Sequence, residues 1–179
     1  MERLDLLTSA GVPTGQTKPK AAVHRDGDWH LAVHIWIQRP DGALLMQRRS
    51  PQKENDPDRW DISVAGHVAA GESAEEAARR EVAEEIGLSI HTHQLEPLFR
   101  LAESRHLNGG TYLDYEWHQV YRVAAAPRLA ALHLQTEEVA ALRWVPWPDF
   151  VAAVARRPAD WVPHWAEYAR LIERLAPLA

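Results

Sequence analysis

Residues 66–88 read GHVAAGESAEEAARREVAEEIGL, the stretch with the clearest helix signals and the densest acidic cluster of the chain. Ser73 and Glu76 form an S-x-x-E capping box, and Gly87 stands where a left-handed C-terminal cap belongs. The sequence therefore predicts a helix over residues 73–86. Apolar residues at i, i+4 and i+8 would form its inward side: Ala78, Val82 and Ile86.

Three glutamates share one side of this predicted helix. Glu81, Glu84 and Glu85 stand at i, i+3 and i+4, a spacing at which helical side chains are neighbours. Like charges at this spacing repel one another, so the cluster is either a solvated acidic face or a site that a cation fills. Ligands that are all oxygen favour a hard cation, Mg²⁺ or Mn²⁺.

Two neighbouring features favour the cation site. Gly66 ends a predicted strand and Glu72 precedes the helix cap, so the loop between them brings a fourth carboxylate toward the helix. Arg80 lies next to Glu81 and offers a bidentate partner that would fix a carboxylate in place. The acidic cluster would then be an organised site rather than a charged surface.

The same residues match a known family pattern. Gly66, five residues, Glu72, seven residues and the run REVAEEIGL at 80–88 fill every fixed position of the Nudix box. The chain thus resembles the Nudix hydrolases. This resemblance implies a mixed β-sheet between helices, and Mg²⁺- or Mn²⁺-dependent cleavage of a diphosphate that is linked to another moiety.

The resemblance also assigns roles to single residues. In Nudix hydrolases the glutamates of the box and the carbonyl of its first glycine bind the divalent ions. Such ions neutralise the diphosphate and activate a water for attack on phosphorus. Glu72 and Arg80 would support the site. Carried over, the catalytic metal ligands would be the Gly66 carbonyl, Glu81, Glu84 and Glu85.

A second resemblance extends over residues 2–146. The segments HRDGDWHLAV at 24–33, WDISVAGH at 60–67 and DYE at 114–116 resemble the branch that contains type 1 isopentenyl-diphosphate isomerases and their hydrolase relatives. The isomerases hold a metal through histidines and acidic residues at matching positions. Asp114 stands where the family has a glutamate. The implied ligands are His24, His30, His67, Asp114 and Glu116.

One difference separates this chain from the isomerases. The isomerases carry a catalytic cysteine two residues before the position of His67, and here that residue is Ala65. The isomerases also have a degenerate Nudix box, whereas this one is intact. Both differences favour hydrolysis, with Glu81 and Glu116 as candidate general bases. An isomerase-like enzyme and a Nudix-fold ligand-binding domain without turnover are the alternatives.

Three basic residues are candidates for binding the substrate phosphates. Arg48, Arg49 and Lys53 follow a predicted strand, and guanidinium groups suit diphosphate oxygens. Strand alternation points Arg48 and Arg49 to opposite faces, so at most one of them would reach the substrate. The alternative is a pair of surface arginines at a strand end.

Other polar and aromatic residues receive structural interpretations. His34 and His118 are expected on solvated strand faces, and His164 receives no functional role. Four tryptophans could stack a nucleobase or line a prenyl pocket, but packing in the core and on the sheet is the preferred interpretation. They are Trp29, Trp36, Trp60 and Trp117.

The order of elements predicts an α+β fold. A hairpin is expected over 2–17, and two C-terminal helices would begin at Pro148 and at Asp160. With the family resemblance, the chain is expected to form one Nudix hydrolase domain over 1–179, its mixed sheet sandwiched between helices. Alternation and turn signals predict strands at 31–38, 43–49, 60–64, 98–102, 111–124 and 138–145.

Composition narrows the classes of partner. The chain has 179 residues and a formal net charge of −5, and this negative charge disfavours a nucleic-acid polymer or an anionic membrane as partner. It has no cysteine, which excludes thiolate chemistry. Residues 66–88 hold six acidic and two basic residues, so most of the net charge belongs to the predicted metal site. We expect a soluble, cytoplasmic protein that acts on a small-molecule organic diphosphate, and a homodimer is compatible with the resemblance.

Overall fold

The computed structural model describes residues 2–175 and contains a mixed seven-stranded sheet. The strand order is β5-β4-β3-β8-β7, with β6 paired to β3 and β9 paired to β4. Only β3 and β8 run parallel among these pairs. The strands are β3 (His30–Gln38), β4 (Leu44–Arg49), β5 (Trp60–Asp61), β6 (Val64–His67), β7 (Glu96–Leu107), β8 (Tyr112–Ala124) and β9 (Val139–Val145).

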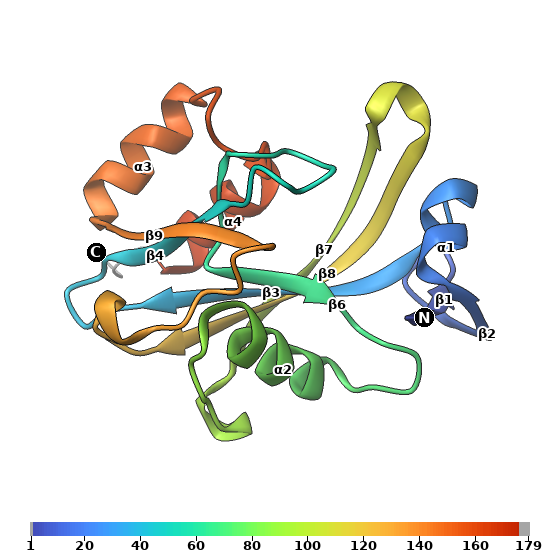
Figure 1. Cartoon of the computed structure of the whole chain (residues 1–179), viewed down its shortest axis with the longest axis horizontal. Helices are drawn as coiled ribbons and strands as arrows, with labels where there is room; N and C mark the ends of the chain where they lie inside the picture. Colours follow the sequence, from blue (N-terminus) through green and yellow to red (C-terminus); the bar gives the residue numbers. More distant parts are fainter. Residues whose placement is uncertain (1, 176–179) are drawn as a thin grey trace.

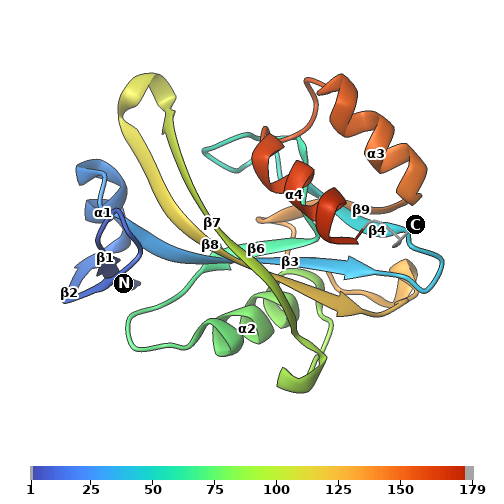
Figure 2. The ribbon, with the colours of Figure 1, turned by 180° about the vertical axis from the view of Figure 1, so that it is seen from behind.

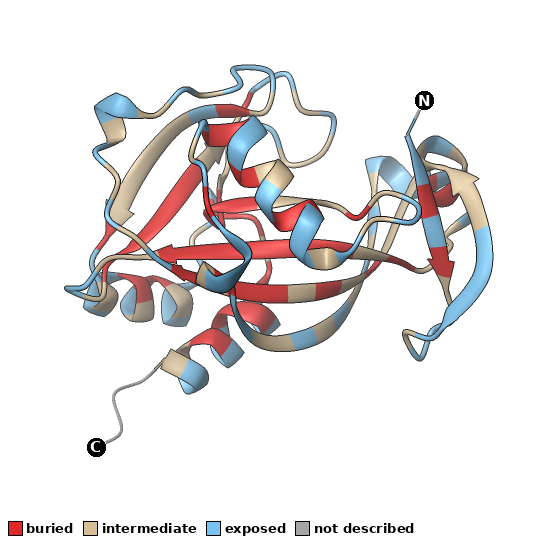
Figure 3. Ribbon diagram, turned by 90° about the horizontal axis from the view of Figure 1, so that it is seen from below, coloured by how far each residue is buried: buried red, intermediate tan, exposed pale blue. Residues whose placement is uncertain are grey.

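Helices cover both faces of this sheet, as Figures 1 and 2 show. Helix α2 (Ala74–Ile86) packs on one face, and α3 (Trp147–Arg156) and α4 (Trp165–Leu175) pack on the other. Burial is concentrated along the central strands and on the inward sides of the helices (Figure 3). The predicted α+β sandwich is therefore confirmed. No helix within residues 2–175 has the length and apolar character needed to traverse a bilayer.

Alternation along β3 divides the core into two layers. Val33, Ile35 and Ile37 point toward α2, whose Val82 and Ile86 belong to the same buried cluster. The intervening residue Trp36 points to the opposite face and packs with Phe150 of α3 and Tyr168 of α4. Polar residues that share this second face are consequently covered by the C-terminal helices.

A small N-terminal unit caps one end of the sheet (Figure 1). The predicted hairpin is formed by β1 (Arg3–Leu7) and β2 (Pro13–Pro19). It continues into α1 (Lys20–Asp26), a short helix that the sequence interpretation missed. Leu4, Leu6 and Val23 form a separate apolar cluster between these elements. Through α1 this unit contributes His24 to the interior.

Helix α2 begins and ends where its sequence signals predict. The Ser73 hydroxyl accepts a hydrogen bond from the Glu76 amide at 3.3 Å, and the Glu76 carboxylate accepts from the Ser73 amide at 2.9 Å. Gly87 takes the left-handed conformation at φ 67°. Its amide donates to the Ala83 carbonyl and closes the last turn.

Three predicted elements differ from the structure. The strand expected over 60–64 is two strands, because β5 pairs with β4 whereas β6 pairs with β3. The final helix begins at Trp165 rather than at Asp160, because a residue that precedes a proline disfavours helical geometry, and Val162 precedes Pro163. The strand predicted over 98–102 is longer and runs from Glu96 to Leu107.

Candidate metal and catalytic site

A cavity of 780 Å³ lies beside the ends of β3, β6 and β8 and is bounded by α2, the loop at 52–56 and the β7–β8 arm. The sheet register brings its histidines and acids together, because His30 pairs with Glu116 and Ala32 pairs with His67. Most of the predicted site residues line this cavity. They are Arg49, Lys53, Gly66, His67, Arg80, Glu81, Glu84, Glu85, Asp114 and Glu116.

The glutamates of α2 differ in their surroundings. Glu81 lies directly against Gly66, so close that a Cβ at position 66 would overlap its carboxyl group. Glu85 is buried and accepts a hydrogen bond from the Gln47 amide at 3.2 Å, whereas the Glu84 side chain is 54% exposed. Burial raises the pKa of both Glu81 and Glu85 above that of an ordinary glutamate. A cation at these carboxylates would relieve that cost.

Arg80 joins the helix to the loop that precedes it. Its Nε and Nη2 atoms donate to the two carboxylate oxygens of Glu72 at 2.9 Å each. Its Nη1 atom donates to Glu81 at 2.7 Å, and Nη2 also donates to the His67 carbonyl at 3.0 Å. One guanidinium thus fixes the loop and the orientation of Glu81. This geometry matches the supporting role predicted for Glu72 and Arg80.

A second group of potential ligands lies at the N-terminal end of the cavity. One ligand atom from each of His24, His30, His67 and Asp114 lies within 4.8 Å of the others. The Nε2 atoms of the three histidines are buried and make no hydrogen bond within residues 2–175. Unsatisfied imidazole nitrogens beside a carboxylate fit a divalent transition metal.

Glu116 connects to this histidine group. Its Oε1 atom lies 3.2 Å from the Nε2 atoms of both His30 and His67, and Oε2 accepts from His118 Nε2 at 3.0 Å. Burial would raise the pKa of Glu116, but the contacts with His118, His30 and His67 hold it well below that of an ordinary glutamate. Glu116 is therefore ionised over the neutral range and can serve as a ligand.

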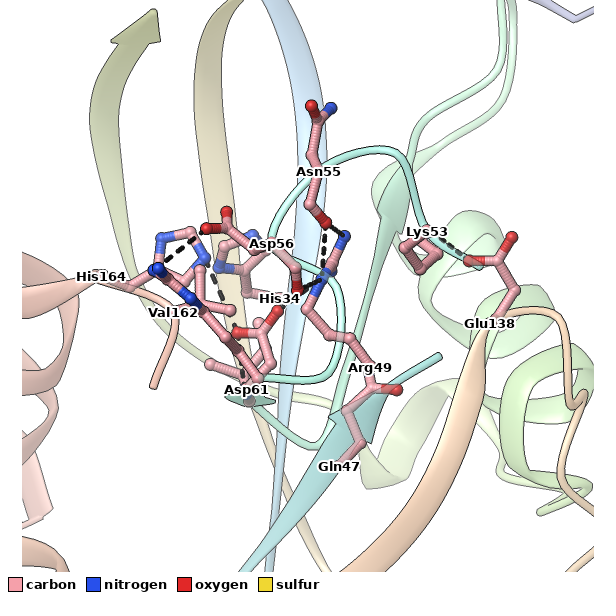
Figure 4. A network of polar contacts seen from close by, with 12 residues as sticks. His34, Gln47, Arg49, Lys53, Asn55, Asp56, Asp61, Glu138, Val162 and His164 are labelled. Carbon is pink, nitrogen blue, oxygen red and sulfur yellow. Dashed lines mark hydrogen bonds and ion pairs between the residues drawn. The ribbon is translucent and has the colours of Figure 1, made fainter. Parts of the chain in front are cut away.

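The basic residues predicted for the substrate phosphates have other partners. Arg48 does not line the cavity and pairs with Asp58 at 2.8 Å, which fits the expectation that at most one of the two arginines faces it. Arg49 lines the cavity, but Nε donates to the carbonyls of Asn55 and Asp56 at 3.2 Å each, and Nη1 pairs with Asp61 (Figure 4). Arg49 therefore anchors the loop at 55–56.

Lys53 faces the cavity from the same loop. Its ammonium group pairs with Glu138, which lies at the entry to β9 (Figure 4). Burial raises the pKa of Glu85, and the positive charge of Lys53 partly opposes this rise. The ammonium group of Lys53 therefore lies close enough to Glu85 to affect its ionisation. Of the three basic residues, Arg49 and Lys53 line the cavity.

Two histidines expected on solvated faces are buried. His34 is 3% exposed and His118 is 1% exposed, because helix α4 covers this face of the sheet. Both rings contact Glu167 of α4, a buried carboxylate that the sequence interpretation missed. The signal that could have found it is an acidic residue at the helical spacing of the buried positions Tyr168 and Leu171.

The four tryptophans serve packing rather than the cavity. Trp36 is fully buried, Trp60 stacks under Arg143, and Trp117 lies beneath Gly11. Trp29 packs against Tyr115. In the part of the chain that the structure describes, none of these four lines the cavity. The preferred interpretation as core and sheet residues fits the structure.

Comparison with known proteins identifies the family. A family model described as a NUDIX domain matches residues 28–165, most of the chain. The chain belongs to the Nudix family. This Nudix protein is 38% identical over 145 residues to an uncharacterized Nudix hydrolase of Listeria innocua, a match that covers 81% of this chain and 80% of that protein. It is 37% identical to Nudix hydrolase 3 of Arabidopsis thaliana over 96% of this chain, and it spans 23% of that relative's length.

Isomerases are also among the relatives, as the second resemblance predicts. An isopentenyl-diphosphate Delta-isomerase of Escherichia coli is 32% identical over 157 residues, covering 88% of this Nudix chain and 84% of the isomerase. The intact box and the Nudix hydrolases among its relatives place the chain among the hydrolases. Ala65 lines the cavity beside His67, so the difference from the cysteine of the isomerases lies within the site.

Solved structures share the fold. The crystal structure of DR0079 from Deinococcus radiodurans superposes with a TM-score of 0.73 at 24% identity, covering 94% of this Nudix chain and 98% of that chain. A MutT NUDIX hydrolase from Burkholderia pseudomallei superposes with a TM-score of 0.61 at 18% identity, covering 82% and 98%. These similarities confirm the Nudix fold of the sheet and its flanking helices.

Proposed function

We propose that this Nudix hydrolase cleaves the diphosphate linkage of a small organic diphosphate and depends on Mg²⁺ or Mn²⁺. The main support for this proposal is the negative charge of the residues that line the cavity. Among residues 2–175, eleven carboxylates and only five lysine or arginine side chains line it. A substrate that bears a diphosphate would be repelled by this surface unless divalent cations accompanied it.

The acidic helix supplies the proposed ligands. Glu81, Glu84, Glu85 and the Gly66 carbonyl would bind the ions, and Arg80 would hold Glu81 in place. Bound at these oxygens, Mg²⁺ or Mn²⁺ would neutralise the diphosphate and acidify a water for attack on phosphorus. All three glutamates line one wall of the cavity, which supports a shared role.

The pKa directions distinguish the two candidate bases. Burial raises the pKa of Glu81, so its carboxylate accepts a proton more readily than an ordinary glutamate does. The pKa of Glu116 is held low by its histidine neighbours. We therefore assign metal binding, and not proton acceptance, to Glu116 together with the histidine group, and Glu81 remains a proposed metal ligand.

The histidine group supports a second proposed metal site. His24, His30 and His67 present buried Nε2 atoms without hydrogen bonds among the described residues, with Asp114 and Glu116 as the adjacent carboxylates. Such a mixed nitrogen and oxygen set suits Zn²⁺, Fe²⁺ or Mn²⁺ better than a site of oxygens alone.

The histidine group also favours one alternative function, an isomerase-like reaction on isopentenyl diphosphate. The obstacle is Ala65, because its methyl group offers no acid or base to one side of the allylic system. Incubation of the metal-loaded protein with isopentenyl diphosphate, followed by NMR, tests this alternative. Appearance of the allylic isomer would establish it, and unchanged substrate would remove it.

A substrate panel tests the hydrolase proposal. The protein is assayed with Mg²⁺ or Mn²⁺ against nucleotide sugars, dinucleotides, nucleoside triphosphates, coenzyme A, thiamine diphosphate and prenyl diphosphates, with phosphate or monophosphate release as readout. Glu84→Gln and Glu85→Gln are expected to abolish turnover with the fold intact. Glu137→Gln, an exposed carboxylate at the same cavity, is the matched control and should retain activity.

Two outcomes would contradict the proposal. Undiminished turnover in both Glu84→Gln and Glu85→Gln would separate the acidic helix from the chemistry. Tight ligand binding without turnover under either metal would instead indicate a Nudix-fold binding domain.

A further inference from the structure

A buried polar network connects the C-terminal helix to the histidine group. Glu167 lies in the first turn of α4 and is fully buried. Its Oε1 atom accepts a hydrogen bond from Trp36 Nε1 at 2.9 Å, and its Oε2 atom is 2.7 Å from His34 Nδ1. The same Oε2 atom lies 3.3 Å from His118 Nδ1. Three groups of the sheet therefore meet one carboxylate of the helix.

His118 stands between two carboxylates. Its Nδ1 atom faces Glu167, and its Nε2 atom lies 3.0 Å from Glu116 Oε2. The ring also stacks on His34 at a centroid distance of 3.8 Å. A side chain that is confined by stacking on His34, by one hydrogen bond at Nε2 and by a carboxylate 3.3 Å from Nδ1 has little freedom to turn. His118 thus links Glu167 to Glu116, so a change at Glu167 would alter the contact of His118 with Glu116.

The two oxygens of Glu116 have separate partners. His118 holds Oε2, while Oε1 faces the Nε2 atoms of His30 and His67 at 3.2 Å each. Rotation of the carboxylate would withdraw Oε1 from the histidine group. The hydrogen bond from His118 to Oε2 therefore keeps Oε1 directed toward the histidine group.

Packing of α4 explains why position 167 is buried but not why it carries a charge. The neighbouring inward residues Tyr168 and Leu171 are buried without charge, whereas Glu167 accepts a hydrogen bond from the buried indole of Trp36. A buried carboxylate is unfavourable unless it is paired. Here the contacts with Trp36, His34 and His118 offset that cost.

We propose that Glu167 is a positioning residue: it holds His118, which holds Glu116 with Oε1 turned toward His24, His30 and His67. Glu167 thereby increases the affinity of the histidine group for a divalent transition metal. This inference rests on the metal-binding role proposed above for the histidine group. Helix α4 would then contribute to metal binding by positioning a ligand, although it provides no ligand itself.

Zn²⁺ affinity of the metal-free, full-length protein tests the proposal, because imidazole ligands favour Zn²⁺. Competition with a chromophoric chelator gives the Kd, and circular dichroism verifies the fold. Loss of a partner that orients a metal ligand typically weakens binding about 10- to 100-fold, and we expect this for Glu167→Gln. Glu103→Gln removes a different carboxylate, which is partly buried and pairs with His164 at 2.6 Å, and it should leave the Kd within about twofold.

Two further variants make the outcome decisive. His118→Gln is expected to weaken Zn²⁺ binding as Glu167→Gln does, and the double variant should be no weaker than His118→Gln alone, because both changes break one connection. Losses that multiply in the double variant, or a wild-type Kd in Glu167→Gln, would overturn the proposal. If Glu167→Gln does not fold, a wild-type Kd in His118→Gln would overturn it equally.

His24→Ala separates this inference from the function on which it rests. Loss of tight Zn²⁺ binding in His24→Ala, with wild-type affinity in Glu167→Gln, would refute the positioning role alone. Retention of tight binding in His24→Ala would show that the histidine group is not the metal site, and both proposals would then fail.

Discussion

At the scale of single residues, Gly66 is required by contact rather than by backbone conformation. A Cβ at this position would overlap the carboxyl group of Glu81. We expect Gly66→Ala to displace the end of the Glu81 side chain and to abolish most of the hydrolase activity, with little loss of stability because that side chain can move aside. Urea unfolding and steady-state rates measure the two effects.

Gly71→Ala is the matched control for this prediction. Gly71 has a φ of +79° with nothing within 4 Å of an added Cβ. Alanine there should cost about 1 kcal/mol through backbone strain and leave kcat unchanged. Equal activity losses in the two variants would mean that contact with Glu81 is not the reason for glycine at 66.

A second residue-scale prediction concerns the buried Glu85. Burial raises its pKa in the folded protein above the value in the unfolded chain. Its contribution to stability is therefore complete below the ordinary glutamate pKa and is lost as the pH rises toward the folded pKa. In metal-free protein, Glu85→Gln should raise Tm relative to wild type at pH 8 and less so at pH 4.5. An equal shift at both pH values would contradict this linkage, and Glu137→Gln provides the exposed control.

The sequence alone predicted which residues share one face of a helix or strand. It did not predict which of those faces another element of the fold would bury. The glutamates of 66–88 share one helix, so their alignment follows from its period. Alternation along β3 placed His34 on a defined face, but it could not reveal that α4, more than 120 residues later, covers that face. Glu167 escaped notice for the same reason. Strand alternation did separate Arg48 from Arg49 correctly.

At the scale of elements, α2 positions the acidic cluster, and its N-terminal cap can be tested separately from the site. Ser73→Ala removes the hydroxyl that accepts from Glu76, which should cost about 1 kcal/mol. Glu84 lies eleven residues further along, about 16 Å at 1.5 Å per residue, so kcat/KM should stay within about twofold. Chemical unfolding and initial rates at a temperature where both proteins are folded provide the comparison.

Ser73→Thr retains the hydroxyl and should restore most of the lost stability. A large fall in activity in Ser73→Ala alone would instead indicate that the cap controls the geometry of the cluster. The cap and the C-terminal glycine explain why this helix was predictable to within one residue. The split of the strand predicted over 60–64 was not predictable, because it depends on which neighbour each half pairs with.

At the scale of the whole molecule, the site is assembled from distant parts of the chain. The N-terminal helix supplies His24, the sheet supplies His30, His67 and Glu116, and α2 supplies the box glutamates. The C-terminal helix closes the opposite face of the same strands. A domain built in this way gathers acidic groups that repel one another, so binding of the proposed cations would be coupled to folding.

This coupling gives the last prediction. Addition of Mg²⁺ to metal-free protein should raise Tm more than NaCl at equal ionic strength does, because bound ions stabilise the folded state while NaCl only screens the repulsion. At a concentration 100 times the Kd the gain is about 2.7 kcal/mol, or about 5–10 °C for a chain of this size. In Glu84→Gln/Glu85→Gln the advantage of Mg²⁺ over NaCl should disappear. Identical Tm curves for the two salts in wild-type protein would mean that the carboxylates around the cavity do not form a divalent cation site.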